Sequence, residues 1–137
     1  MDKESFLRQF MDEVWNKKDF DAVEKFVHET YQIHLDTADP WEGKVLSHQE
    51  FKERLQYSFN SFPDIHFEIT SAITEENHVA ITWILTGNNL GSIGNFPPTF
   101  KPIKTTGMTI YHFTEGKISG HSQVFDRIAV MKQLGFR

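Results

Sequence analysis

The sequence contains no cysteine among its 137 residues. This absence excludes disulfides, thiolate nucleophiles and metal sites built from cysteine. Runs of lysine and arginine are also absent, and 19 acidic residues outnumber 14 basic ones, which gives a formal net charge of −5. Nucleic acids and anionic membranes are both bound through clusters of positive charge. The sequence therefore predicts neither a nucleic acid nor a membrane as a partner.

Long apolar runs are missing as well. No stretch approaches the roughly 18 apolar residues of a membrane-spanning helix, and the charged opening MDKESFLRQF does not resemble a secretory signal peptide. We therefore expect a cytoplasmic protein, and the length fits a single domain over residues 1–137. Aromatic residues, in contrast, are abundant, with 13 Phe, 3 Trp and 3 Tyr. Such side chains suit a thick core or the lining of a pocket.

The first half of the chain has mainly the apolar periodicity of helices. Apolar residues share one face over 6–15 and again over 22–27, which predicts two helices, the second capped by Asp19. A strand is predicted at 31–35, where apolar residues alternate with polar ones. The segment 47–50 has the serine and glutamate of a capping box and opens a third helix.

From residue 65 the period changes to two. Four strands and a short final helix are predicted at 65–69, 79–85, 103–113, 117–125 and 127–134. A long loop rich in glycine, proline and asparagine separates the second and third of these strands. Consecutive antiparallel strands with helices on one side make an α+β fold. We expect its curved sheet to enclose a pocket for a small, largely apolar molecule.

The last two predicted strands can be paired residue by residue. Thr114-Glu115-Gly116 matches a three-residue hairpin loop, which makes Phe113 face Lys117 and puts Ile118 and His121 on opposite faces. A two-residue loop would shift the pairing by one residue. In the predicted register one face carries most of the groups that form hydrogen bonds and exchange protons: Thr105, Gly107, Thr109, Tyr111, Ser119, His121, Gln123 and Phe125.

Five short motifs follow one another between residues 62 and 135. They are Phe62-Pro63-Asp64-Ile65, Thr86-Gly87-Asn88-Asn89-Leu90-Gly91, Phe96-Pro97-Pro98-Thr99-Phe100-Lys101, Phe113-Thr114-Glu115-Gly116-Lys117-Ile118 after Gly107, and Asp126 with Gln133-Leu134-Gly135. Upstream, Tyr31 and His34 form a Tyr-x-x-His pair. Together these motifs resemble the SnoaL-like polyketide cyclase family of the nuclear-transport-factor-2-like superfamily. The resemblance implies a cone-shaped, curved antiparallel sheet that wraps around N-terminal helices and encloses a pocket.

The resemblance also implies a reaction. Known members close a polyketide ring by intramolecular aldol condensation without metal or cofactor, using a buried group that moves a proton between carbon and a carbonyl oxygen. In the family this group is an aspartate in an E-x-W-D stretch of the last strand, and the aligned residues here are Gly120-His121-Ser122-Gln123. Gln123 has no titratable proton, so it can orient a carbonyl but cannot act as its base.

Two histidines are candidates for the catalytic proton carrier. His121 is the first, because histidine titrates near neutral pH. His34 is the second, since the family match suggests that it points into the pocket, although it alternates with Tyr31 and Ile33 along its strand. The candidates for substrate binding are Gln123, Thr109, Tyr111 and Phe59. An exposed strand histidine or a core aromatic residue is the plainer interpretation of each histidine and aromatic side chain.

A metal site and a cofactor are not predicted. His28, His34, Asp36 and Asp39 lie close together in the sequence, but they lack a ligand spacing such as HExxH. Glycine-rich phosphate motifs and a Ser-His-Asp arrangement are also absent from the sequence.

Three functions are consistent with these observations. The first is a cofactor-free enzyme that acts on a polyketide-like or other hydrophobic carbonyl substrate through His121 or His34. The second is a non-catalytic binder or sensor of a small apolar ligand, in which Gln123 supplies a hydrogen bond instead of chemistry. The third is an interaction module, because the open face of such sheets commonly pairs with a second copy. A homodimer or higher homo-oligomer is expected on that basis.

Overall fold

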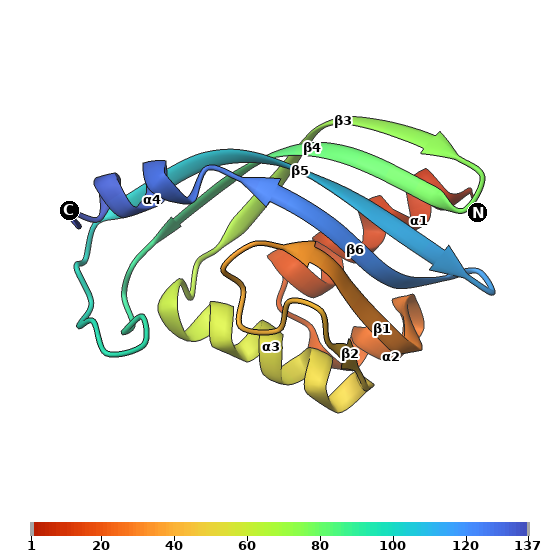
Figure 1. Cartoon of the computed structure of the whole chain (residues 1–137), viewed down its shortest axis with the longest axis horizontal. Helices are drawn as coiled ribbons and strands as arrows, with labels where there is room; N and C mark the ends of the chain where they lie inside the picture. Colours follow the sequence, from red (N-terminus) through yellow and green to blue (C-terminus); the bar gives the residue numbers. More distant parts are fainter. Residues whose placement is uncertain (1, 137) are drawn as a thin grey trace.

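The computed structural model describes residues 2–136 (Figure 1). Its helical elements are α1 (Lys3–Phe10), the π-helical segment η1 (Met11–Asn16), the 3-10 turn η2 (Phe20–Ala22), α2 (Val23–Phe26), α3 (His48–Ser61) and α4 (Arg127–Gln133). Its strands are β1 (Val27–Asp36), β2 (Val45–Leu46), β3 (His66–Glu75), β4 (His78–Asn88), β5 (Pro102–Thr114) and β6 (Lys117–Phe125). None of the helices between residues 2 and 136 is long and apolar enough to cross a membrane.

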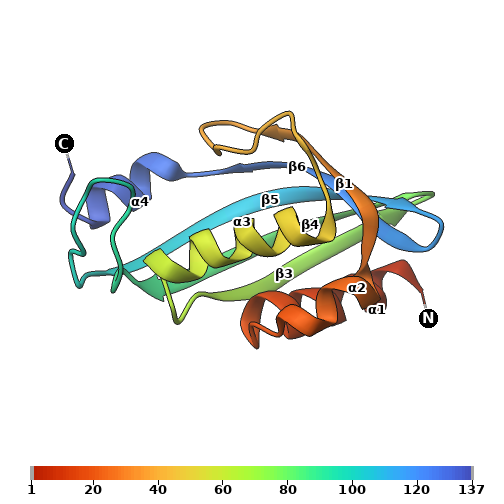
Figure 2. The ribbon, with the colours of Figure 1, turned by 90° about the horizontal axis from the view of Figure 1, so that it is seen from below.

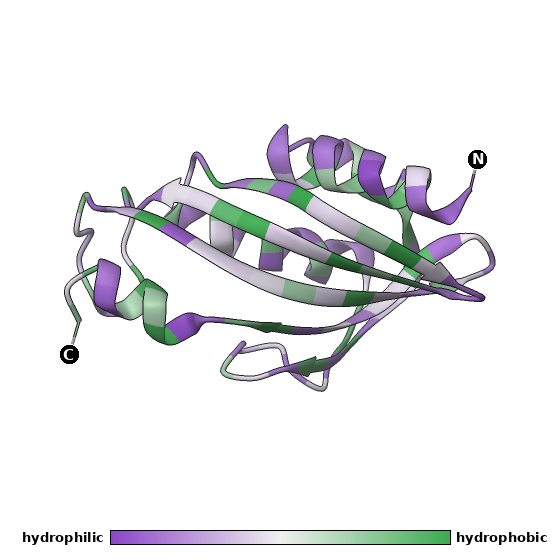
Figure 3. Cartoon of the chain, turned by 90° about the horizontal axis from the view of Figure 1, so that it is seen from above, coloured by the Kyte–Doolittle hydropathy of each residue, from purple (hydrophilic) through white to green (hydrophobic). Residues whose placement is uncertain are grey.

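The six strands form one curved sheet in the order β2-β1-β6-β5-β4-β3. Strands β3 to β6 are the predicted antiparallel meander, while β1 runs parallel to β6. Helices α1, α2 and α3 all lie on one side of this sheet (Figure 2). On the other side, no helix among the described residues covers β4, β5 and β6 (Figure 3). The predicted α+β fold, with N-terminal helices on a curved and mostly antiparallel sheet, is confirmed.

The sequence signals for the helices hold with one exception. Ser47 and Glu50 form the predicted capping box at the start of α3. The second predicted helix is shorter than expected, because α2 ends at Phe26 and Val27 begins β1. Val27 pairs with Ile118 of β6, and this contact between strands overrides the local helical pattern.

The hairpin between β5 and β6 has a two-residue turn instead of the predicted three-residue loop. Glu115 and Gly116 both have positive φ, of 52° and 78°, which is the geometry of a tight hairpin turn. Thr114 therefore pairs with Lys117, and the predicted register was wrong. A second shift of the pairing follows at a bulge after His112.

These two shifts preserve the grouping of the functional side chains. Each shift moves the pairing by one residue. Beyond the bulge the two shifts add up to two residues, so each side chain lies on the face that the prediction gave it. Tyr111 now faces His121 and Thr109 faces Gln123, and all four share one face as predicted. Ile118 lies between the turn and the bulge and is fully buried like His121, so the prediction that these two residues lie on opposite faces was wrong.

Strand β1 departs from the alternation that its sequence predicts. An irregularity in the pairing with β6 follows Ile33, so Leu35 is 47% exposed while Asp36 is 1% exposed. The two strands approach closely at Gly120, where a Cβ atom would lie 2.5 Å from the backbone oxygen of Gln32. The irregularity thus turns a carboxylate toward the inside of the sheet.

Candidate active site

A cavity of about 530 Å³ lies on the inner side of the sheet. Its walls are formed by α3, by the inner faces of β3 to β6, by the loop after β1 and by α4. Most of the lining is apolar or aromatic, including Trp15, Phe67, Trp83 and Phe125. The volume falls in the range typical of small-molecule sites.

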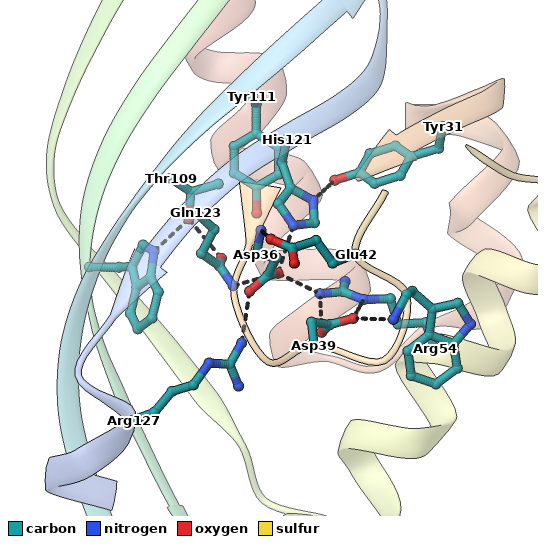
Figure 4. Close-up of polar contacts among 12 residues, drawn as sticks. Tyr31, Asp36, Asp39, Glu42, Arg54, Thr109, Tyr111, His121, Gln123 and Arg127 are labelled. Atoms are coloured by element: carbon teal, nitrogen blue, oxygen red, sulfur yellow. Dashed lines mark hydrogen bonds and ion pairs between the residues drawn. The ribbon is translucent and has the colours of Figure 1, made fainter. Parts of the chain in front are cut away.

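One wall of this cavity contains a cluster of polar side chains centred on Asp36 (Figure 4). Four side chains donate hydrogen bonds to its carboxylate. Oδ2 accepts from Nε2 of His121 at 2.9 Å, Nη2 of Arg54 at 3.1 Å and Nε2 of Gln123 at 3.2 Å, and Oδ1 accepts from Nη2 of Arg127 at 2.8 Å. His121, Arg54, Gln123 and Arg127 also line the cavity, whereas Asp36 lies behind them.

The carboxylate of Asp36 is ionised. Burial alone would raise its pKa, but the hydrogen bond from His121 and the positive charges of Arg54 and Arg127 outweigh burial and hold the pKa below its usual value. Arg54 is shared with a second carboxylate, since its Nη2 also lies 3.0 Å from Oδ2 of Asp39. The buried charges are therefore paired, as a low-dielectric site requires.

The ring of His121 is held through both of its nitrogen atoms. Nε2 contacts Asp36, and Nδ1 lies 2.5 Å from the hydroxyl of Tyr31. Burial lowers the pKa of His121, and the hydrogen bond to Asp36 offsets this effect only in part. Burial also raises the pKa of Tyr31 well above its usual value, so the phenol keeps its proton. At neutral pH the site thus holds a neutral imidazole next to a protonated tyrosine.

The side chain of Gln123 has a fixed orientation. Trp83 Nε1 donates to Thr109 Oγ1 at 2.9 Å, and Thr109 Oγ1 donates to Gln123 Oε1 at 2.8 Å. Because the amide oxygen accepts from Thr109, the amide nitrogen must face Asp36. This nitrogen has two protons, and Asp36 is its one hydrogen-bond partner among residues 2–136. The second proton can bind a group in the cavity.

The predicted site residues fall into three groups in the structure: in the cavity wall, directly behind it, and away from it. His121, Gln123 and Tyr111 line the cavity. Thr109 is 1% exposed and lies behind Gln123 rather than in the wall. The hydroxyl of Tyr111 donates to the sulfur of Met11 at 3.5 Å, a weak partner that a ligand oxygen can replace.

Besides Thr109, two predicted site residues lie outside the cavity wall, and both of these predictions need correction. Phe59 packs edge-on against Trp15 and Phe20, each at 5.8 Å between ring centroids, so it belongs to the core between α3 and the N-terminal helices. His34 is exposed on the outer face, with its ring 4.4 Å from that of His112. Strand alternation turns His34 away from the inward-facing Ile33, so the family match misled for this residue.

The four residues weighed for a metal site do not converge. Asp36 and Asp39 bind Arg54, and His34 lies on the outer face. His28 contacts the carboxylate of Glu115 at 3.1 Å. No group of three histidine, aspartate or glutamate side chains within the described part of the chain is arranged to hold a metal ion.

Sequence reasoning missed Asp36, Arg54 and Arg127 as site residues. A signal for Arg54 existed, because it follows Phe51 by three residues and so lies on the apolar stripe of α3, where a charge needs a buried partner. Asp36 could not be found in this way, because the irregularity in β1 reverses the face that alternation predicts.

The fold and its inward-facing cavity define a domain of the nuclear-transport-factor-2-like class. The model of the SnoaL-like polyketide cyclase family matches residues 5–134, and the chain belongs to this family.

Solved structures agree with this assignment. A candidate polyketide cyclase from Acidithiobacillus ferrooxidans is 36% identical with a TM-score of 0.89, over 95% of this chain and 92% of that one. A SnoaL-like polyketide cyclase from Agrobacterium tumefaciens is 19% identical with a TM-score of 0.78, over 96% and 97% of the two chains. AclR from Streptomyces galilaeus, a candidate hydroxylase, is 20% identical with a TM-score of 0.78, over 96% and 94%. The last two show the fold alone. No curated protein sequence matches the chain.

Proposed function

We propose that this protein catalyses cofactor-free acid/base chemistry on a small hydrophobic carbonyl compound. The reaction is an intramolecular aldol-type closure or a related isomerase or hydrolase step. The observation that carries the proposal is His121, a neutral imidazole in the wall of an otherwise mainly apolar cavity. Family membership supports it, but similar folds include candidate cyclases and a candidate hydroxylase, so the fold does not decide the chemistry.

The charges around the cavity favour a neutral substrate. Two carboxylates, Asp36 and Asp39, pair with two guanidinium groups, Arg54 and Arg127. Their charges cancel, so the cluster offers no excess positive charge to a carboxylate or phosphate ligand. A ketone, aldehyde or ester with an apolar body fits both this neutrality and the aromatic lining.

Gln123 stands where the family has its catalytic aspartate, and in this proposal it binds the carbonyl oxygen instead of taking a proton. Its amide nitrogen is oriented by Thr109 and Asp36 and has a second proton to donate. Arg127, which stacks on Phe125 at 4.2 Å, is a second donor to the same oxygen. Fixed donors of this kind stabilise the negative charge that develops when a proton leaves the neighbouring carbon.

His121 takes that proton. Its Nδ1 has the basic lone pair, because Nε2 must carry the hydrogen that Asp36 accepts. The hydroxyl of Tyr31 occupies Nδ1 in the resting site, so in this proposal the substrate must displace this hydroxyl from Nδ1. The lowered pKa of His121 keeps the imidazole neutral, and therefore able to accept a proton, throughout the neutral range.

Hydrogen–deuterium exchange into 2-tetralone tests the proposal without knowledge of the natural substrate. This bicyclic ketone loses an α-proton when a base forms its enolate, so catalysed exchange in D2O is visible by proton NMR. We expect the wild-type protein to accelerate exchange over buffer. We expect His121→Gln to lose the acceleration by about a hundredfold or more, the usual contribution of a general base.

The matched control is His34→Gln, which removes a histidine from the outer face of the sheet. It is expected to exchange at the wild-type rate. Equal rates for His121→Gln and the wild type would overturn the assignment of the base.

A non-catalytic binder is the second candidate function. It is favoured by the hydrogen bonds at both nitrogens of His121, which leave no free ring nitrogen in the resting site. A binder would show saturable, stoichiometric binding of 2-tetralone and no exchange above the buffer rate. The exchange measurement therefore separates the two functions.

We also propose that the chain pairs with a second copy through the outer face of its sheet. Met108, Ile110 and Val124 are exposed there at 55%, 46% and 55%. An apolar group of this kind is typical of an interaction surface when, as here, none of the helices described for residues 2–136 covers that face of the sheet.

A further inference from the structure

The role of Asp36 is not explained by contact with a ligand, because it does not line the cavity. It is 1% exposed, and all four side chains that contact its carboxylate are donors. A buried charge is costly unless its environment is built for it. Any effect of Asp36 on a ligand must therefore act through a side chain that lies between it and the cavity, and His121 is one of these.

Asp36, His121 and Tyr31 form a chain of two hydrogen bonds, and the donor of each bond is fixed. An ionised carboxylate can only accept, so Nε2 of His121 carries the proton of that contact. A neutral imidazole then has its lone pair on Nδ1, which accepts from the hydroxyl of Tyr31. Neither hydrogen bond can be reversed. The carboxylate of Asp36 accepts from two arginines and has no proton to donate, so Nε2 of His121 must be the donor and Nδ1 the acceptor.

We propose that Asp36 is the positioning residue that fixes the tautomer and the charge state of His121, so that Nδ1 is the basic atom that serves the cavity. Arg54 and Arg127 keep Asp36 ionised for this purpose. The inference rests on the proposed function, in which His121 is the base.

The proton transfer can be written with its charges balanced. The α-carbon–hydrogen bond of the carbonyl compound breaks, its proton forms a bond to Nδ1, and its electron pair moves to the carbonyl oxygen as an enolate held by Gln123 and Arg127. His121 becomes an imidazolium ion, and the carboxylate of Asp36, at 2.9 Å from Nε2, stabilises its positive charge. The reverse transfer, to carbon or to oxygen, restores the neutral ring.

A purely structural role for Asp36 makes different predictions. In that case the carboxylate would serve to anchor Arg54 and Arg127, and the state of the imidazole would not depend on it. Asn at this position separates the two roles. The three donors around Oδ2 favour the amide oxygen there, so Asp36→Asn keeps an acceptor for Nε2 but removes the charge.

Nitrogen-15 NMR of the histidine rings, in the absence of any substrate, gives the first readout. The signals of His121 are assigned by their loss in His121→Gln. We expect the wild-type ring to be protonated at Nε2 alone near pH 7. We expect the pKa of His121 to fall in Asp36→Asn by about one pH unit or more, because a charge in direct contact is lost. Asp39→Asn is the matched control, since it also removes a partner of Arg54 but does not contact the ring, and its effect should be much smaller.

The rate and pH profile of 2-tetralone exchange give the second readout. In Asp36→Asn the plateau rate should fall by up to about tenfold, the most that a general base loses with one pKa unit, and the acidic limb should move to lower pH. A wild-type ring protonated at Nδ1, or an unchanged His121 titration in folded Asp36→Asn, would overturn the inference. If Asp36→Asn does not fold, the wild-type tautomer still decides. If the NMR results hold but the wild type catalyses no exchange, the proposed function fails while the coupling of Asp36 to His121 stands.

Discussion

Tyr31 joins two roles that a single substitution can separate. Its ring packs edge-on against Phe51 at 4.8 Å between centroids, and its hydroxyl donates to Nδ1 of His121. Phenylalanine keeps the packing and removes the donor. The site therefore allows the energetic contribution of one buried hydrogen bond to be measured.

Tyr31→Phe should lower the free energy of unfolding by about 1–2 kcal/mol, because it leaves the buried Nδ1 acceptor without its partner. It should also raise the pKa of His121, since the lost donor favours the neutral ring. Urea denaturation and the NMR titration of His121 measure the two effects. Tyr57→Phe, at a more exposed tyrosine that packs on Trp41, is the control. A stability and a pKa both equal to those of the wild type would show that the Tyr31 contact is not formed.

The residues of the site were predictable to different degrees. Strand periodicity was enough to group four of them, because alternate residues of a strand share a face. An error of two residues in the pairing leaves that grouping unchanged, so Thr109, Tyr111, His121 and Gln123 were found. Asp36 was not found, because an irregularity in the pairing of β1 moves its side chain to the opposite face of the sheet. That irregularity depends on the contact of β1 with β6, and the two strands are 80 or more residues apart in sequence. Local patterns contain no information on such a contact.

The same distinction holds for whole elements. The meander of β3 to β6 and the capping box of α3 follow from local signals, and both are confirmed. The parallel pairing of β1 with β6 has no local signal, although it closes the polar wall of the cavity. It also brings His34 to the outer-face pair of His78 and His112, which neighbouring strands β4 and β5 already place opposite each other. The ring of His112 on β5 lies 4.4 Å from that of His34 and 4.7 Å from that of His78.

This histidine cluster should make stability depend on pH. Burial, and then the proximity of His34 and His78, lower the pKa of His112 from 6.5 to about 4. Between these two values the unfolded chain binds a proton that the folded chain does not, so the stability falls as the pH decreases from 6.5 toward 4. His112→Gln should flatten this dependence in urea denaturation at pH 7, 6 and 5, at one protein concentration.

Other titrating groups do not obscure this result. The pKa of His121 is also lowered, but His121 contributes equally to the wild type and to His112→Gln. The stability that Asp36 contributes is lost only below its ordinary pKa of 3.8, outside the window. His66→Gln, at an exposed histidine of β3, is the control. An identical pH dependence in the wild type and His112→Gln would contradict the effect of the cluster.

At the scale of the whole molecule, the two faces of the sheet have different tasks. The inner face holds the cavity and its polar wall, and the helices cover it (Figures 1 and 2). The outer face has Met108, Ile110 and Val124 exposed over neighbouring strands β5 and β6. A chain with a net charge of −5 repels its own copies, and an apolar face is where this repulsion is outweighed most easily.

Ile110→Glu tests the pairing of two copies through this face. The wild type is expected to have twice the chain mass of 16.0 kDa by light scattering at micromolar concentration, which is about 32 kDa. A glutamate at Ile110 puts two negative charges into a symmetric interface without partners, so this variant should have the mass of one chain. Ile128→Glu adds the same charge at an isoleucine of α4 that is 67% exposed, and it should remain paired. A wild-type protein that stays at one chain mass at high concentration would rule out the interface, and a dimer that survives Ile110→Glu would place it elsewhere.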